Sequence, residues 1–362
     1  MEIIKTKVFN TISQRILYGL NFMYSAYAPV ESEKTDVQSQ KKLHEKLQQI
    51  LDRLYENPKL LNFPDTVDEA WEWHELNNSK PELDALYKSI CKTLFDFYKF
   101  LYFSSLKGTI EDGSLFVSSL ALKEEKVSYK AQYKILLHEV GIEINKQKSG
   151  ICFFAERGIM ESFQFLAERV PVHVNPWTPY ALINFACCSF TGDFGYLLSR
   201  VDNVADLGGL LPDIERRCLE NGYKRCIKCS FGPSGFDFRI TYTKNVGGFI
   251  FGYNPRKYWQ FYFGSLNGIG VKAMLEDFDN LDNDLQTYLL SVCRSCNGCR
   301  SCTKGGKNRV HTVKVTYNGK EYALCPDTYS RNNWETIRLD TAKVLFKYHD
   351  MQEVYGSDWK KK

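Results

Sequence analysis

Apolar residues in the first hundred positions recur every three or four residues, which is the spacing at which a helix buries one face. Three such series are present, over residues 8–23, 43–54 and 83–101. Pro58 ends the second series, and Ser79 with Glu82 has capping-box spacing before the third. Residues 28–42 are polar, which indicates a linker after the first series. We therefore predict a helical region over residues 1–105.

After this region the pattern changes to short apolar segments separated by turns, beginning with the turn at Asp112-Gly113. We expect Ser128 to cap a helix that ends at Gly141, where a left-handed backbone is favoured. A hairpin over residues 142–154 follows, with its turn at 146–150.

The order of helix, glycine and two-stranded wing resembles that of winged-helix DNA-binding domains. The predicted helix offers a phosphate backbone only Lys130, Lys134 and His138. Two interpretations of residues 106–200 therefore stay open. One is a mixed region of helix and hairpin that packs locally, which we favour, and the other is a winged-helix-like DNA-binding domain.

Alternation of apolar and polar residues is clearest in residues 236–243, and it returns in 249–253 and 259–263. Because successive strand residues face opposite sides of a sheet, the pattern predicts three antiparallel strands with one aromatic face. A single helix over residues 271–292 has its apolar residues in register and should cover that face. The alternative is an exposed face that stacks on the bases of single-stranded nucleic acid.

Residues 293–302 contain four cysteines, arranged as two Cys-Arg-Ser-Cys units around Asn297-Gly298. A fifth, Cys325, follows a predicted hairpin whose turn is Asn318-Gly319. A Cys-x-x-Cys knuckle brings two thiolates to one ion, and tetrahedral zinc takes four ligands. The layout is similar to that of a zinc ribbon. The predicted ligands of a structural Zn²⁺ are Cys293, Cys296, Cys299, Cys302 and Cys325.

Five thiols compete for four positions, so one cysteine is surplus. We expect the surplus cysteine to be Cys302 or Cys293. Cys325 lies at the end of the strand that closes the module, and a role as a metal ligand is the simplest explanation for a cysteine at that position. An iron–sulfur cluster is the alternative cofactor, since the first three cysteines have ferredoxin-type spacing. The separate Cys-x-x-Cys pair at 226–229 would join the site only if the fold brought it near, and His311 is expected to be exposed.

Between positions 294 and 320 the chain has seven basic residues and no acidic one. These charges can offset the net charge of minus two that four thiolates leave around a zinc ion, or they can contact nucleic acid or an acidic protein surface. We favour compensation, because the preceding segment 271–292 is acidic and can pair with them. The candidate contact residues are Arg300, Lys304, Lys307, Arg309 and Lys314.

Composition indicates an ordinary folded protein, with 44% hydrophobic and 25% charged residues. A chain of 362 residues exceeds one core, so we predict an α+β multidomain protein with a C-terminal Cys-rich module. The predicted domains are residues 1–105, 106–200, 201–292 and 293–362. Twelve cysteines, without the apolar run of a signal peptide or a membrane span, predict a reducing, cytoplasmic location and no membrane association.

No catalytic signature is present in the sequence. Neither His74-Glu75 nor His138-Glu139 continues into a zincin motif, and no phosphate-binding loop or nucleophile elbow occurs. We therefore predict a metal-binding interaction protein, with association to nucleic acid as an open possibility. The alternative is an enzyme with a small-molecule site beside the aromatic sheet, with Arg256, Lys257 and Tyr258 at its rim.

Overall fold

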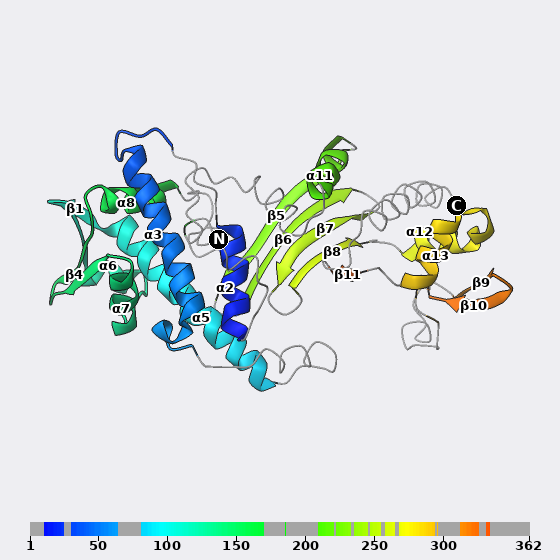
Figure 1. Ribbon diagram of the computed structural model, residues 1–362, viewed down its shortest axis with the longest axis horizontal. Coiled ribbons are helices and arrows are strands. Elements are labelled where there is room, and N and C mark those ends of the chain that lie inside the picture. The colour runs from blue at the N-terminus through cyan, green and yellow to red at the C-terminus, as the bar shows by residue number, and fades with distance from the viewer. Residues whose placement is uncertain are drawn as a thin grey trace. The chain divides into compact units, whose positions relative to one another are not determined.

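The computed structural model describes the chain in segments separated by gaps (Figure 1). The described residues are 11–24, 30–63, 81–169, 185, 209–220, 222–232, 235–244, 247–254, 258–264, 268–293, 295, 312–325 and 331–333. They form helices and sheets in one α+β chain with two compact units. The first unit comprises residues 1–204, 228–238 and 254–257, and the second comprises 205–227, 239–253 and 258–362.

Helices dominate the first unit. They are α2 (Ile12–Met23), α3 (Val37–Glu56), the 3-10 turn η1 (Pro58–Leu61), α5 (Pro81–Lys107) and α8 (Ile159–Arg169). These confirm the helical pattern of the first hundred residues within the described part. The helix α3 begins six residues before the first residue of its apolar series, because Asp36 accepts a hydrogen bond from the Ser39 amide at 2.8 Å and so caps it. The expected linker over residues 28–42 is therefore shorter than predicted.

A small antiparallel sheet follows α5 in the same unit. Its strands are β1 (Thr109–Glu111), β2 (Ser114–Ser118), β3 (Glu143–Lys146) and β4 (Gly150–Phe154), in the order β1-β2-β4-β3. Two short helices, α6 (Ser119–Glu124) and α7 (Ala131–Glu139), connect β2 to β3. The predicted turn at Asp112-Gly113 and the predicted hairpin over 142–154 are both confirmed.

The helices between β2 and β3 differ from those predicted from the sequence. The helix α6, which Ser118 caps through the Ala121 amide, was not predicted. The expected cap at Ser128 is wrong, because α7 begins only at Ala131 and has Lys130 in the capping position with no side-chain hydrogen bond. Gly141 does adopt a left-handed backbone after α7, with φ of 70°.

Aromatic side chains from three elements fill the core of this unit. The ring centroid of Tyr133 on α7 lies 5.2 Å from that of Phe97 and 5.1 Å from that of Phe100, both on α5. Phe153 on β4 lies 5.6 Å from Phe100. All four side chains are buried. This cluster fixes α7 and the small sheet to the long helix α5.

The second unit contains α11 (Leu210–Glu220) and most of a five-stranded sheet. The strands are β5 (Lys224–Gly232), β6 (Gly235–Lys244), β7 (Gly247–Asn254), β8 (Tyr258–Gly264) and β11 (Arg331–Asn333), in the order β11-β8-β7-β6-β5. The three predicted strands are confirmed as β6, β7 and β8, and β5 and β11 were not predicted. Most side chains of the aromatic face lie outside the described residues, so its burial stays a prediction.

The predicted single helix over 271–292 is wrong. The segment forms α12 (Gly268–Glu276), a 3-10 turn η2 (Phe278–Asn280) and α13 (Asn283–Val292). The break occurs because Asp282 takes an extended backbone and its carboxylate accepts a hydrogen bond from the Leu285 amide at 3.0 Å, which starts a new helix. Its apolar residues remain buried across the break, including Met274, Phe278 and Leu285.

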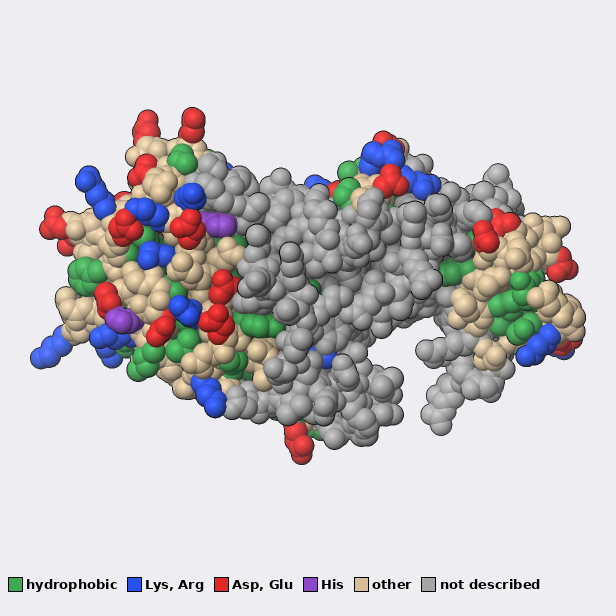
Figure 2. Space-filling model, in the orientation of Figure 1, with side chains coloured by type: hydrophobic (Ala, Val, Ile, Leu, Met, Phe, Trp, Pro, Cys, Tyr) green, Lys and Arg blue, Asp and Glu red, His purple; other side chains and the backbone are tan. Residues whose placement is uncertain are grey.

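On the face drawn in Figure 2, acidic and basic side chains are interspersed over the described part of the first unit. Such a surface has no extended field of one sign, so any charged site must be identified from local groups. None of the described helices is long and apolar enough to cross a membrane.

Candidate metal centre

The helix α13 delivers the chain to the first cysteine of the cysteine run. Leu285 and Leu289 form its buried face, and the Cys293 amide donates to the Leu289 carbonyl at 2.9 Å. Cys293 then turns into an extended backbone and is itself 5% exposed. The cysteine run therefore starts from a fixed helix end.

A hairpin precedes the last cysteine. Its strands are β9 (Val313–Tyr317) and β10 (Lys320–Leu324), paired in antiparallel register from Val313 opposite Leu324 to Tyr317 opposite Lys320. Asn318 and Gly319 both have positive φ, which is the geometry that two-residue hairpin turns require. The predicted hairpin and its turn are confirmed.

The hairpin is anchored to the helices before it. The Tyr317 hydroxyl donates to the Asn283 side chain at 2.7 Å and lies 3.1 Å from the Thr287 hydroxyl. Its ring meets Phe278 edge-on, with centroids 6.2 Å apart. Sequence analysis missed this contact, although an aromatic residue at the end of a strand is a weak signal for one.

A single backbone bridge brings the two ends of the cysteine set together. Ser295, two residues after Cys293, pairs in antiparallel fashion with Leu324, which directly precedes Cys325. Paired strands lie about 4.8 Å apart, so the start of the cysteine run lies one strand spacing from the end of β10. Cys325 is half-buried there.

The other predicted ligands, Cys296, Cys299 and Cys302, lie outside the described residues, as do Arg300, Lys304, Lys307, Arg309 and His311. Within the described residues no three potential metal ligands gather. The structure therefore describes the first and the last of the five predicted ligands, Cys293 and Cys325.

Two further sequence candidates are placed by the structure. Cys226 lies exposed in the extended strand β5, so the 226–229 segment does not form the tight turn of a zinc knuckle. Lys314 is exposed on β9 and forms an ion pair with Glu321 at 2.8 Å, which raises the pKa of the lysine. This exposed lysine therefore has an acidic partner within the hairpin.

The alternative enzyme site beside the sheet gains no support. Arg256 and Lys257 lie outside the described residues, and so does the side chain of Tyr258. On β6 the consecutive residues Ile240, Thr241 and Tyr242 are all buried, so both faces of the strand are covered at this point.

Tyr242 and the neighbouring Cys218 are titratable groups that are both buried. Burial raises the pKa of Tyr242, and Glu215 and Cys218 on α11 raise it further. Burial likewise raises the pKa of the Cys218 thiol to about 12. A thiol with this pKa stays protonated at neutral pH and is a poor nucleophile, which is typical of core packing.

Comparison with known proteins identifies no relative. No family model matches the chain, no curated protein matches it, and no solved structure matches it. A functional assignment must therefore come from the residues and their arrangement.

Proposed function

We propose that the C-terminal module binds one structural Zn²⁺ and that the protein acts as a metal-stabilised interaction protein. The observation that carries this proposal is the bridge between Ser295 and Leu324, since it brings the start of the cysteine run beside Cys325. Thiolates from distant parts of a chain that meet at one point are the usual ligands of structural zinc.

The bridge also favours a particular ligand set. Successive residues of a paired strand face opposite sides, so Cys325 lies on the side opposite Leu324 and Ser295. Extending the pairing by one residue would put Cys296 on the side of Cys325, whereas Cys293 is buried at the end of α13. We therefore assign the ion to Cys296, Cys299, Cys302 and Cys325, with Cys293 as the surplus cysteine.

Zinc supplies a cross-link in this proposal. Structural zinc sites release about 10 to 16 kcal/mol on binding, and this energy stabilises the fold that holds the ligands. The cysteine side chains would hold β10 to the segment after α13. The pair of Lys314 with Glu321 supports charge compensation within the module for this lysine, rather than contact with nucleic acid.

Metal analysis of the full chain, purified without chelators, tests the proposal. We expect about one zinc per chain, which is the stoichiometry of a single four-ligand site. Cys296→Ser and Cys325→Ser should release the metal and raise hydrogen exchange in β9 and β10, because metal binding and folding are coupled. Cys293→Ser should retain it, and Cys226→Ser, which changes an exposed cysteine on β5, is the matched control.

Other outcomes contradict parts of the proposal. Protein without metal would refute the site itself, and a brown chromophore with bound iron would favour an iron–sulfur cluster. Loss of zinc in Cys293→Ser would refute the ligand assignment and leave the metal site standing.

A further inference from the structure

A second feature of the chain lies in the first unit and is independent of the cysteines. From α5 onward the chain runs helix, strand β2, helices α6 and α7, then strands β3 and β4, with β4 paired between β2 and β3. This is the connectivity of a winged-helix module, in which α7 is the exposed second helix and β3–β4 is the wing. The extra strand β1 pairs only with the outer side of β2.

The wing and the turn before α7 lie against each other. The Lys146 ammonium at the end of β3 is 5.5 Å from the ring centroid of Tyr129, which precedes α7. The Tyr129 ring in turn lies 6.0 Å from Phe100 on α5. The tip of the wing and the start of α7 therefore belong to one surface.

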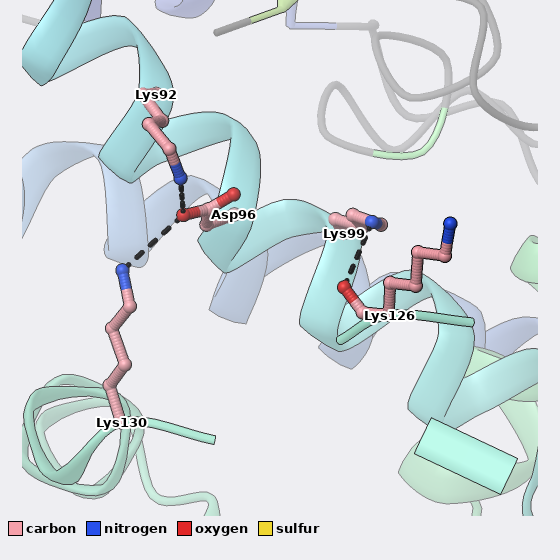
Figure 3. A network of polar contacts seen from close by, with 5 residues as sticks. All are labelled: Lys92, Asp96, Lys99, Lys126 and Lys130. Carbon is pink, nitrogen blue, oxygen red and sulfur yellow. Dashed lines mark hydrogen bonds and ion pairs between the residues drawn. The ribbon is translucent and has the colours of Figure 1, made fainter. Parts of the chain in front are cut away.

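Charged side chains of α5 contact the segment between α6 and α7 at two points beside this surface (Figure 3). The Lys99 ammonium on α5 donates to the Lys126 carbonyl at 3.1 Å. Lys92 and Lys130 share one oxygen of Asp96, at 2.7 and 3.4 Å. The network holds four lysines and one carboxylate, so positive charge is in excess.

Lys99 lies among charges of both signs. Partial burial lowers the pKa of Lys99, the carboxylates of Asp96 and Glu125 raise it, and Lys92 and Lys126 lower it by a smaller amount.

The outer face of α7 continues the same surface. Tyr133, Leu136 and Leu137 point into the core, whereas Lys134 and Ile135 are exposed. Ile135 is 55% exposed. Lys134, together with Lys148 on the wing, makes no ion pair with any residue that the structure describes.

Charge is polarised along α7. The lysines gather at its N-terminal end and on the wing, while Glu139 and Glu143 lie at its C-terminal end, where Glu143 pairs with His138 at 3.3 Å. The positive end of the helix dipole coincides with the lysines, so the N-terminal end of α7 is the end that attracts anions.

We propose that α7, the turn before it and the β3–β4 wing form a binding surface for duplex DNA. An α-helix with its side chains is about 10 to 12 Å across and fits the major groove, which is about 12 Å wide. Lys134 and Ile135 would face the groove, and Lys126, Lys146 and Lys148 would contact phosphates on either side. This surface does not depend on the proposed zinc site.

Fluorescence anisotropy with the full chain and a labelled duplex of two helical turns tests this proposal. We expect binding that weakens steeply between about 50 and 200 mM NaCl, because phosphate contacts release counterions. The double change Lys134→Gln and Lys148→Gln should weaken binding about tenfold or more, and the loss of the phosphate contact of Lys148 should reduce the salt slope by about one. Both lysines are exposed, so the fold should be unaffected.

A matched double change, Lys41→Gln and Lys224→Gln, removes the same charge from exposed positions on α3 and β5 and should leave binding unchanged. The proposal is overturned if no duplex binds at the lowest salt, or if a single strand of equal length binds more tightly. It is also overturned if Lys304→Glu, Lys307→Glu and Arg309→Glu abolish binding while the α7 and wing variant retains it. Zinc content, measured on the same samples, reports separately on the metal site.

Discussion

Tyr133 offers a direct test of the core that supports α7. Its side chain is fully buried, with the rings of Phe97 and Phe100 against it and the Lys130 ammonium 5.8 Å from its centroid. Its hydroxyl finds no hydrogen-bond partner among the described residues. Burial raises the pKa of this tyrosine, because the charged form cannot be solvated there. The ring stabilises the core, and the hydroxyl destabilises it.

Removing only the hydroxyl should therefore stabilise the unit. A buried polar group without a partner costs about 1 to 3 kcal/mol, so we expect Tyr133→Phe to stabilise the folded unit by about 1 to 2 kcal/mol. Removing the whole ring has the opposite sign, because truncating a buried aromatic side chain to alanine costs about 3 to 5 kcal/mol.

Hydrogen exchange in peptides from α5 and α7 measures this difference locally. Tyr133→Phe should slow exchange there about 5- to 30-fold, which corresponds to 1 to 2 kcal/mol. Tyr133→Ala should accelerate it strongly. Tyr322→Phe, which changes a half-buried tyrosine on β10, is the control and should leave α7 unaffected. Faster exchange in Tyr133→Phe would refute the reasoning, because it would mean that the hydroxyl makes a stabilising hydrogen bond.

Two further predictions concern the first unit. Gly158 and Gly113 both have positive φ, of 83° and 76°, but an added Cβ would overlap Ser39 at Gly158 and would meet open space at Gly113. Gly158→Ala should therefore lower the urea midpoint of unfolding clearly more than Gly113→Ala. Equal decreases of the urea midpoint in the two variants would show that the Ser39 side chain moves to make room for the added methyl group. Burial raises the pKa of Tyr102 from 10.0 to about 12, so the folded state keeps a proton that the unfolded chain loses. This contribution to the free energy of unfolding is complete below pH 10 and is lost as the pH rises to 12, by about 1.4 kcal/mol per pH unit. In urea titrations, Tyr102→Phe should therefore show a smaller loss of stability between pH 10 and 12. An unchanged slope would mean that Tyr102 titrates alike in both states.

The sequence by itself determined the elements whose information is local. Asn318-Gly319 between two alternating segments specified the β9–β10 hairpin, because few residues other than asparagine and glycine tolerate positive φ at both turn positions. Gly141 marked the end of α7 for the same reason. The cysteine spacing likewise predicted a metal module, since the ligands of a knuckle are close in sequence.

Tertiary structure decided what depends on distant partners. The strand β5 lacks strict alternation, and it is a strand because it pairs with β6. The prediction of one helix over 271–292 is wrong because the periodic apolar pattern continues across a break, and the cap at Asp282 starts a separate helix, α13.

The two proposed sites differ in the same way. The cysteine run and Cys325 as its distant partner were predicted from the sequence, and the pairing of Ser295 with Leu324 is the tertiary contact that brings the two segments together. The lysine network has no sequence signature, since Lys99 and Lys126 are 27 residues apart and meet only because α5 packs against the segment before α7. Local backbone preferences are encoded within a few residues, whereas charge clusters are produced by packing between residues far apart in the chain.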